Sequence, residues 1–129
     1  MLTELHGTQP LDLYPIKSGG TVTENAIVVI DAAGDVVDAT DAAGVKVIGI
    51  AINVDSTAAT VEVRDGIVLI ANSATNPLAR KDRGATAYIE DANTVSAVTG
   101  INSVVAGLVV DVNDDGVFVD MRLAALAAA

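Results

Sequence analysis

The sequence predicts an all-β protein, a compact small β-barrel or β-tulip-like sandwich of about eight to ten short strands. Two observations predict this class. Segments rich in Val and Ile recur at about 8–12-residue spacing, and clusters of Gly, Asn and Asp separate them. The chain has 129 residues, so one domain is expected, and a domain of this size buries about two-thirds of its unfolded surface without metals or disulfides.

The first half of the chain is expected to form hairpins. A turn with Gly34 at a positive φ should connect the first two strands. Residues Thr60–Arg64 alternate apolar and polar side chains, so one face of this strand should meet solvent. The run Ile67–Ala71 is continuously apolar, which is typical of a strand covered on both faces. The strands expected here are Asn25–Ile30, Asp35–Ala39, Lys46–Asp55, Thr60–Arg64 and Ile67–Ala71.

The second half begins with an ambiguous segment, residues Asn72–Arg83. It is either a helical turn opened by Asn76 with Pro77 at its first position, or an irregular loop, so at most one short helix is expected. In the last strand, Val117, Val119 and Met121 should share one face. No internal repeat of fixed period is visible. The strands expected here are Ala85–Glu90, Thr94–Val98, Val104–Val112 and Gly116–Leu123.

The two ends of the chain differ from this β pattern and set the expected boundaries. Residues 1–20 combine scattered Leu and Ile with two prolines and a Gly-Gly pair, which indicates an extended N-terminal arm with apolar anchors. The alternative is an ordinary first edge strand with a frayed terminus. Residues 21–123 form the expected β-barrel or sandwich domain, and residues 124–129 an Ala-rich tail.

Composition excludes several kinds of partner and chemistry. Aromatic residues make up 2% of the chain, and the net charge is −10, which disfavours nucleic acid and anionic membranes because both attract positive charge. The absence of cysteine excludes thiol catalysis, thiolate metal sites and disulfides. The start of the chain lacks the features of a signal peptide, and its longest apolar runs are about seven residues, short of the ~20 that cross a bilayer.

Catalytic and cofactor motifs are missing from the sequence. The one histidine, His6, lies in the expected arm, and neither a Gly-x-Ser-x-Gly elbow nor a phosphate-binding Gly-x-x-x-x-Gly-Lys motif is found. We therefore expect no enzyme activity, cofactor or metal site. The acidic residues at turn positions, Asp31, Asp35, Asp38 and Asp41, are interpreted as solvated carboxylates. The basic cluster Arg80–Arg83 is interpreted as a solvated loop, with contact to an acidic partner as the alternative.

One motif, Asp111–Gly116, fits the opening of an EF-hand calcium loop. The twelfth position of such a loop is normally Glu, but here it is Arg122, and the flanking segments are expected to be strands rather than helices. A hairpin turn is therefore the favoured interpretation, with a weak calcium contact at Asp111–Asp115 as the alternative.

The body of the chain contains a series of short motifs, each with a glycine. They are Ile30–Gly34, Val47–Ala51, Val61–Val68, Gly84–Asp91, Ala106–Asp111 and Asp115–Val119. In this order of motifs, roughly residues 20–122 resemble the capsid decoration (cement) proteins of tailed bacteriophages, a small β-rich head-stabilising family. Position 88 keeps an aromatic residue, Tyr88, whereas Phe118 stands where the family often has Trp.

The resemblance implies a structural virion protein that binds the outer surface of the assembled head and cements neighbouring major capsid subunits, commonly as a homotrimer. It would lie in the host cytoplasm before assembly and on the virion afterwards. The arm would supply the capsid contact by adding a strand to a neighbouring sheet. Its candidate anchors are Leu5, Pro10, Leu11, Leu13, Tyr14 and Ile16. The alternative function is a generic β adhesion or surface module of a fibre or surface-layer protein.

Overall fold

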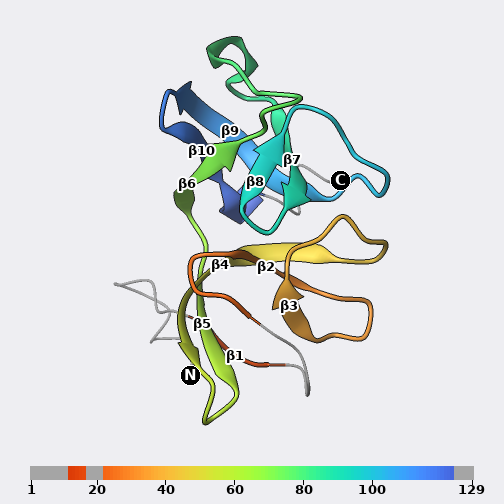
Figure 1. Ribbon diagram of the computed structural model, residues 1–129, viewed down its shortest axis with the longest axis vertical. Helices are drawn as coiled ribbons and strands as arrows, with labels where there is room; N and C mark the ends of the chain where they lie inside the picture. Colours follow the sequence, from red (N-terminus) through yellow and green to blue (C-terminus); the bar gives the residue numbers. More distant parts are fainter. Residues whose placement is uncertain (1–11, 17–21, 124–129) are drawn as a thin grey trace.

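The computed structural model describes residues 12–16 and 22–123, and these are almost entirely β (Figure 1). The all-β prediction is confirmed. The helical segments of these residues are two 3₁₀ turns, η2 (Arg80–Asp82) and η3 (Met121–Leu123), neither of them long enough to span a membrane. The strands are β1 (Asp12–Pro15), β2 (Ile27–Ile30), β3 (Val36–Asp38), β4 (Lys46–Asp55), β5 (Thr60–Arg64), β6 (Ile67–Asn72), β7 (Thr86–Asp91), β8 (Thr94–Ser96), β9 (Val105–Asn113) and β10 (Gly116–Asp120).

The ten described strands form two stacked units (Figure 1). The first unit is a five-stranded sheet in the order β1-β5-β4-β2-β3. The second unit is a closed barrel in the order β10-β6-β8-β7-β9. In the first unit, Ile16 follows β1 and forms a parallel bridge with Val36 of β3, so the two edges of the sheet meet at one point. The first unit is therefore a sheet curled almost into a barrel.

The two units are structural repeats of each other. Strands β1 to β5 correspond to β6 to β10 in order, and each antiparallel pair of the first unit has its counterpart in the second. Even the parallel closure is repeated, because Asn72 of β6 pairs with Val95 of β8 as Ile16 pairs with Val36. Ile16 and its counterpart Asn72 are 56 residues apart in the sequence (72 − 16), whereas Val36 and its counterpart Val95 are 59 residues apart (95 − 36). The spacing between corresponding residues varies, so no fixed period marks the repeat in the sequence.

The repeat extends to the irregular backbone positions. Gly49 in β4 has a φ of +149° and Gly107 in β9 a φ of +154°. Each lies at a register shift in the pairing with a neighbouring strand, β2 for Gly49 and β7 for Gly107. A side chain at Gly49 would meet the Arg64 carbonyl of β5, and one at Gly107 the Asp120 carbonyl of β10. Both units thus require glycine at the same place, where two strands approach closely.

Two hydrophobic cores fill the molecule. The first core lies within the first unit, and the second fills the barrel and extends to residues of β2. The buried residues of the first core are Val22, Val28, Val36, Ala51, Val61 and Val63. The second core contains Ile27, Val29, Ala39, Ile70, Leu78, Ala87, Ile89, Val95, Val104, Ala106, Val109, Val112, Val117, Val119 and Met121. Because β2 contributes to both cores, it fastens the two units together.

Strand β6 is not covered on both faces, so this prediction is wrong. Ile67 is 53% exposed and Leu69 48% exposed, whereas Ile70 points into the second core. Strand β2 is covered on both faces, because Val28 packs in the first core and Val29 in the second. Both strands are apolar runs in the sequence, and only the position of β2 between the units distinguishes them.

The segment between β6 and β7 is an irregular loop that ends in η2, so Asn76 and Pro77 do not open a helical turn. The Asn72 side-chain amide holds this loop, because its Nδ2 donates to the Leu78 carbonyl at 2.8 Å and its Oδ1 accepts from the Leu78 N–H at 2.9 Å. The last strand ends at Asp120 rather than Leu123, and η3 follows it.

Candidate functional site

The predicted anchors of the arm fall into two groups. Asp12–Pro15 is strand β1, paired with β5, so the edge-strand alternative describes these residues better than a free arm. Tyr14 and Ile16 are half-buried and pack against the first core, and the backbone of Leu13 lies opposite Glu62. Leu5, Pro10 and Leu11 lie outside the described residues. Tyr14 and Ile16 therefore already pack against residues of their own chain.

The acidic segment Asp111–Gly116 spans the hairpin of β9 and β10 with its turn at Asp114 and Asp115, so the hairpin of the favoured interpretation is present. Asn113 Oδ1 accepts the Asp115 N–H at 2.8 Å, which is a turn-capping bond. Asp111 Oδ1 lies 3.7 Å from Nε of Arg80, so it pairs with the basic cluster. Among the described residues, no group of three or more His, Asp or Glu side chains is placed to hold a metal ion.

An apolar surface lies on the outside of the second unit, across β6, β10 and β9. Leu69 lies directly opposite Phe118, and side chains opposite each other in a ladder share a face. Ile67 precedes Leu69 by two residues on β6 and shares its face, and Val110, at the register shift of β9 beside Asp111, is 42% exposed. We call Ile67, Leu69, Phe118 and Val110 the outer apolar face. Phe118 is half-buried, and carboxylates lie beside this face, with Asp111 opposite Phe118 and Asp120 opposite Ile67. Exposed apolar side chains rimmed by polar residues mark candidate interaction sites.

The first unit provides an internal comparison for this face. Glu62 on β5 lies opposite Asn53 on β4, as Phe118 on β10 lies opposite Asp111 on β9. There Asn53 Nδ2 donates a hydrogen bond to Glu62 Oε1 at 3.3 Å, and the surface is polar. The same fold is thus built with a polar residue at this position. Phe118 is consequently not required by the architecture.

Asp41 connects the two units through a set of hydrogen bonds that we call the clasp. Its carboxylate accepts the backbone N–H groups of Ile101 at 2.8 Å and Asn102 at 2.9 Å, and Asn102 Nδ2 donates to the Asp41 carbonyl at 2.9 Å. These backbone hydrogen bonds, that of Ile101 first, lower the pKa of Asp41. Asp41 is a solvent-accessible turn residue, as interpreted, and it also holds a loop that is remote in the sequence. Its partners lie 60 residues away, where no local pattern could indicate them.

The clasp fixes residues 97–103, which we call the apolar loop. Gly100 is needed there, because a side chain would come within 2.5 Å of Asp41 Oδ2. Ile101, beside it, is 92% exposed. The corresponding loop of the first unit, between β3 and β4, has the small residues Ala42, Ala43 and Gly44 instead. The large apolar side chain is again a feature of the second unit alone.

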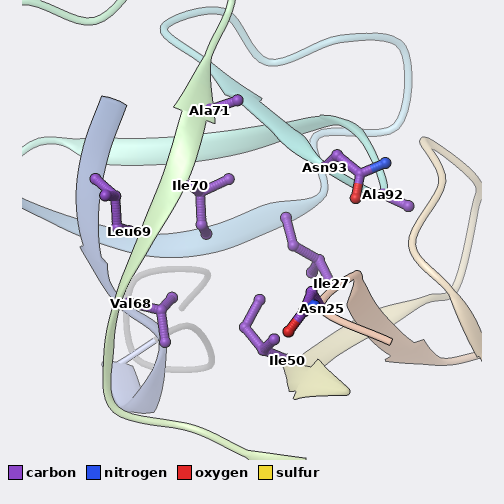
Figure 2. A pocket seen from close by; sticks show the side chains of 9 residues that line it. All are labelled: Asn25, Ile27, Ile50, Val68, Leu69, Ile70, Ala71, Ala92 and Asn93. Carbon is purple, nitrogen blue, oxygen red and sulfur yellow. The ribbon is translucent and has the colours of Figure 1, made fainter. Parts of the chain in front are cut away.

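A hollow of about 340 Å³ opens between the units, and we call it the inter-unit pocket (Figure 2). Ile27 and Ile50 enter it from the first unit, below Ile70 of β6 (Figure 2). Asn25 and Asn93, both exposed, contribute the polar groups of its lining. The pocket is therefore mainly aliphatic and open to the surface.

The described residues thus offer three features for recognition: the outer apolar face, the apolar loop and the inter-unit pocket. All three are built on strands or on a hydrogen-bonded loop, so their shapes are set before any partner binds. No protein-family model matches the chain, and no curated protein or solved structure matches it either.

Proposed function

We propose that this chain is a structural virion protein that binds the outer surface of an assembled phage head and cements neighbouring major capsid subunits. The resemblance of its strand motifs to capsid decoration proteins is one support. The observation that supports the proposal most is the outer apolar face. The second unit carries Phe118 where the same fold in the first unit carries Glu62.

A hydrogen-bonded barrel is suited to this task. The backbone of a closed sheet is ordered before docking, so only the side chains at the contact lose conformational freedom and more of the contact energy appears as affinity. The net charge of −10 keeps unbound copies soluble despite the exposed apolar residues. Attachment of several linked copies, as in the proposed homotrimer, would convert a modest affinity per copy into near-permanent attachment.

The proposal revises the role of the N-terminal segment. Tyr14 and Ile16 are assigned to the first core, and only residues 1–11, with Leu5, Pro10 and Leu11, remain proposed as a capsid-binding extension. The proposal involves no catalysis, cofactor, nucleic acid or membrane. The chain would act first in the host cytoplasm and then on the virion.

The test uses heads that lack this protein, mixed with the purified chain, and measures occupancy by electron microscopy and co-sedimentation. Phe118→Glu, which copies Glu62, and Ile67→Asp should each reduce occupancy at least tenfold, because they place charge in the docking face. Thr57→Asp, in the exposed β4–β5 turn, adds the same charge elsewhere and should bind like the unchanged chain. Equal occupancy for all three variants would contradict the proposal.

A second experiment isolates the N-terminal extension. Deletion of residues 1–11 leaves β1 in place, whereas deletion of residues 1–16 would also remove a strand of the first unit. The shorter deletion should give a folded chain with reduced occupancy. Unchanged occupancy would remove residues 1–11 from the proposal and leave the outer apolar face as the contact.

A further inference from the structure

Residues 124–129, which we call the strap, begin beside the inter-unit pocket. They follow η3, which packs against β4 and β6, the strands that supply Ile50 and Val68 to the lining of the pocket. Met121 of η3 is buried in the second core, and Ile50 and Val68 pack against the same core. We propose that the strap of each chain enters its own inter-unit pocket, with Leu126 as the inserted side chain. This inference does not depend on the proposed function.

The start of the strap is held at the boundary between the two units. Met121 donates its N–H to the Gly66 carbonyl at 2.8 Å, in the connection between β5 and β6. The six residues of the strap can extend about 20 Å, which is about four times the distance between neighbouring strands. The strap can therefore reach the pocket from Leu123. A segment tethered within reach of a site has a high effective concentration there, which favours it over a free partner.

Its point of attachment distinguishes the strap from the other two segments that lie outside the described residues. Residues 1–11 precede β1, and β5 separates β1 from β4 in the sheet. Residues 17–21 lie between Ile16, which bridges to Val36, and Val22, which packs in the first core, so both of their ends are fixed in the first unit. Only the strap starts from an element that packs against a lining strand of each unit.

The strap also matches the pocket chemically. It consists of five alanines and Leu126, and seven of the nine residues that line the pocket are aliphatic. The volume of about 340 Å³ exceeds the space of one leucine side chain, so neighbouring alanines can enter with it. Asn25 and Asn93 supply amide groups for the N–H and C=O groups of the inserted backbone, which need partners once they leave water.

Two exposed carboxylates, Glu24 and Asp91, flank the lining. Glu24 Oε2 accepts the Val54 N–H at 3.2 Å. Asp91 Oδ1 accepts the Asn93 N–H at 2.8 Å. These carboxylates oppose an acidic occupant, and a second copy of this chain carries a net charge of −10. The strap has no charged side chain, so it can enter between them without this repulsion.

Insertion of the strap would fasten the two units to each other. Its start is fixed to the second unit through η3, and Ile27 and Ile50 in the lining belong to the first unit (Figure 2). The chain itself would then fill the pocket, and the outer apolar face and the apolar loop would remain as the surfaces open to partners.

The test introduces pairs of cysteines into this cysteine-free chain. Leu126→Cys is combined either with Asn93→Cys, at an exposed position of the pocket lining, or with Asp65→Cys, at an exposed position beside Gly66. A disulfide requires the two Cβ atoms to approach within about 4.5 Å. The Asn93 pair should therefore form its disulfide at least tenfold faster in a glutathione buffer, as measured by mass spectrometry of the monomer.

The Asp65 pair is the matched control, because Gly66 accepts the Met121 N–H and Asp65 thus neighbours the start of the strap. A strap that stays in solvent would reach this nearby position more readily than the pocket. Equal rates for the two pairs, or a faster reaction of the Asp65 pair, would overturn the inference.

A second measurement needs no cysteine. Deletion of residues 124–129 should shift the methyl resonances of Ile50 and Ile70, which line the pocket, and leave those of Ile101, which does not. Leu126→Asp should act like the deletion, whereas Leu126→Met keeps an apolar side chain of similar volume and should shift these resonances little. Unchanged Ile50 and Ile70 resonances after the deletion would overturn the inference. Neither measurement involves phage heads, so failure of the proposed function would be a separate result.

Discussion

The two units have the same strand order but are closed in different ways. The second unit is closed by β6 and β8, which pair in parallel through two residue pairs, Ala71 with Thr94 and Asn72 with Val95. The first unit is closed by one bridge, between Ile16 and Val36. Its edge strand β1 has four residues, whereas the corresponding β6 has six. The stability of the first unit should therefore depend on its N-terminal strand β1 far more than the stability of the second unit depends on any single strand pairing.

The units also differ in which of their faces are covered. Ile27 and Ile50 of the first unit face the second, where Ile27 packs in the second core and also donates its N–H to the Ala92 carbonyl at 2.7 Å. Among the described residues, the large apolar side chains that are exposed all belong to the second unit: Ile67, Leu69, Val98, Ile101 and Val110.

The largest effect is expected from removal of β1. Deletion of residues 1–16 takes Tyr14 and Ile16 from the first core and leaves the edge of β5 unpaired, which should lower the free energy of unfolding by roughly 4 kcal/mol or more. Hydrogen exchange followed by mass spectrometry should show lost protection in β4 and β5, with protection retained in β9 and β10.

Deletion of residues 1–11 is the matched control, since it keeps all of β1, and its exchange pattern should resemble that of the unchanged chain. Equal loss of protection in both units after the longer deletion would contradict the expectation that the first unit depends more strongly on its N-terminal strand.

The next largest effect is expected at the paired bulge glycines. Gly49→Ala and Gly107→Ala each place a Cβ against a backbone carbonyl at a φ near +150°, so each should lower the free energy of unfolding by about 3 kcal/mol or more. Chemical denaturation measures both values. Because the repeat assigns the two glycines the same role, the losses should agree within about 1 kcal/mol.

Gly34→Ala is the control for these variants, because its φ is +89° but no atom lies within 4 Å of the added Cβ. It should lose only about 1 kcal/mol, the contribution of the left-handed backbone alone. A loss at Gly107 no larger than that at Gly34 would show that the strands can separate to admit a side chain.

The sequence predicts local structure well and contacts between distant segments poorly. Strands β4 and β5 match their expected bounds, because Gly and Asp residues mark the turns beside them. The structural repeat could not be predicted from the sequence, because corresponding positions of the two units share burial and backbone conformation more than residue identity. The exposed face of β6 and the clasp of Asp41 were missed for one physical reason: both depend on neighbours contributed by remote parts of the chain.

A smaller effect is expected from breaking the clasp. Asp41→Ala removes the acceptor of the Ile101 and Asn102 N–H groups, so these two amides should exchange faster while the core strands keep their protection. Nuclear magnetic resonance follows each amide separately. Asp114→Ala, an exposed change in the β9–β10 turn, is the control. Unchanged exchange at both amides in Asp41→Ala would show that the loop holds its shape without the clasp.

The smallest effect concerns pH, and it follows from the lowered pKa of Asp41. Because the folded state binds the Asp41 proton more weakly than the unfolded state, the clasp contributes fully above the unfolded pKa of about 3.9 and is lost as pH falls through the lower folded pKa. The amide shifts of Ile101 and Asn102 should therefore titrate with a midpoint below about 3.9. In Asp41→Asn this titration should vanish. A midpoint at or above the unfolded value would mean that the carboxylate is not held by these N–H groups in solution, and the connection between the two units would then rest on β2 and its core contacts.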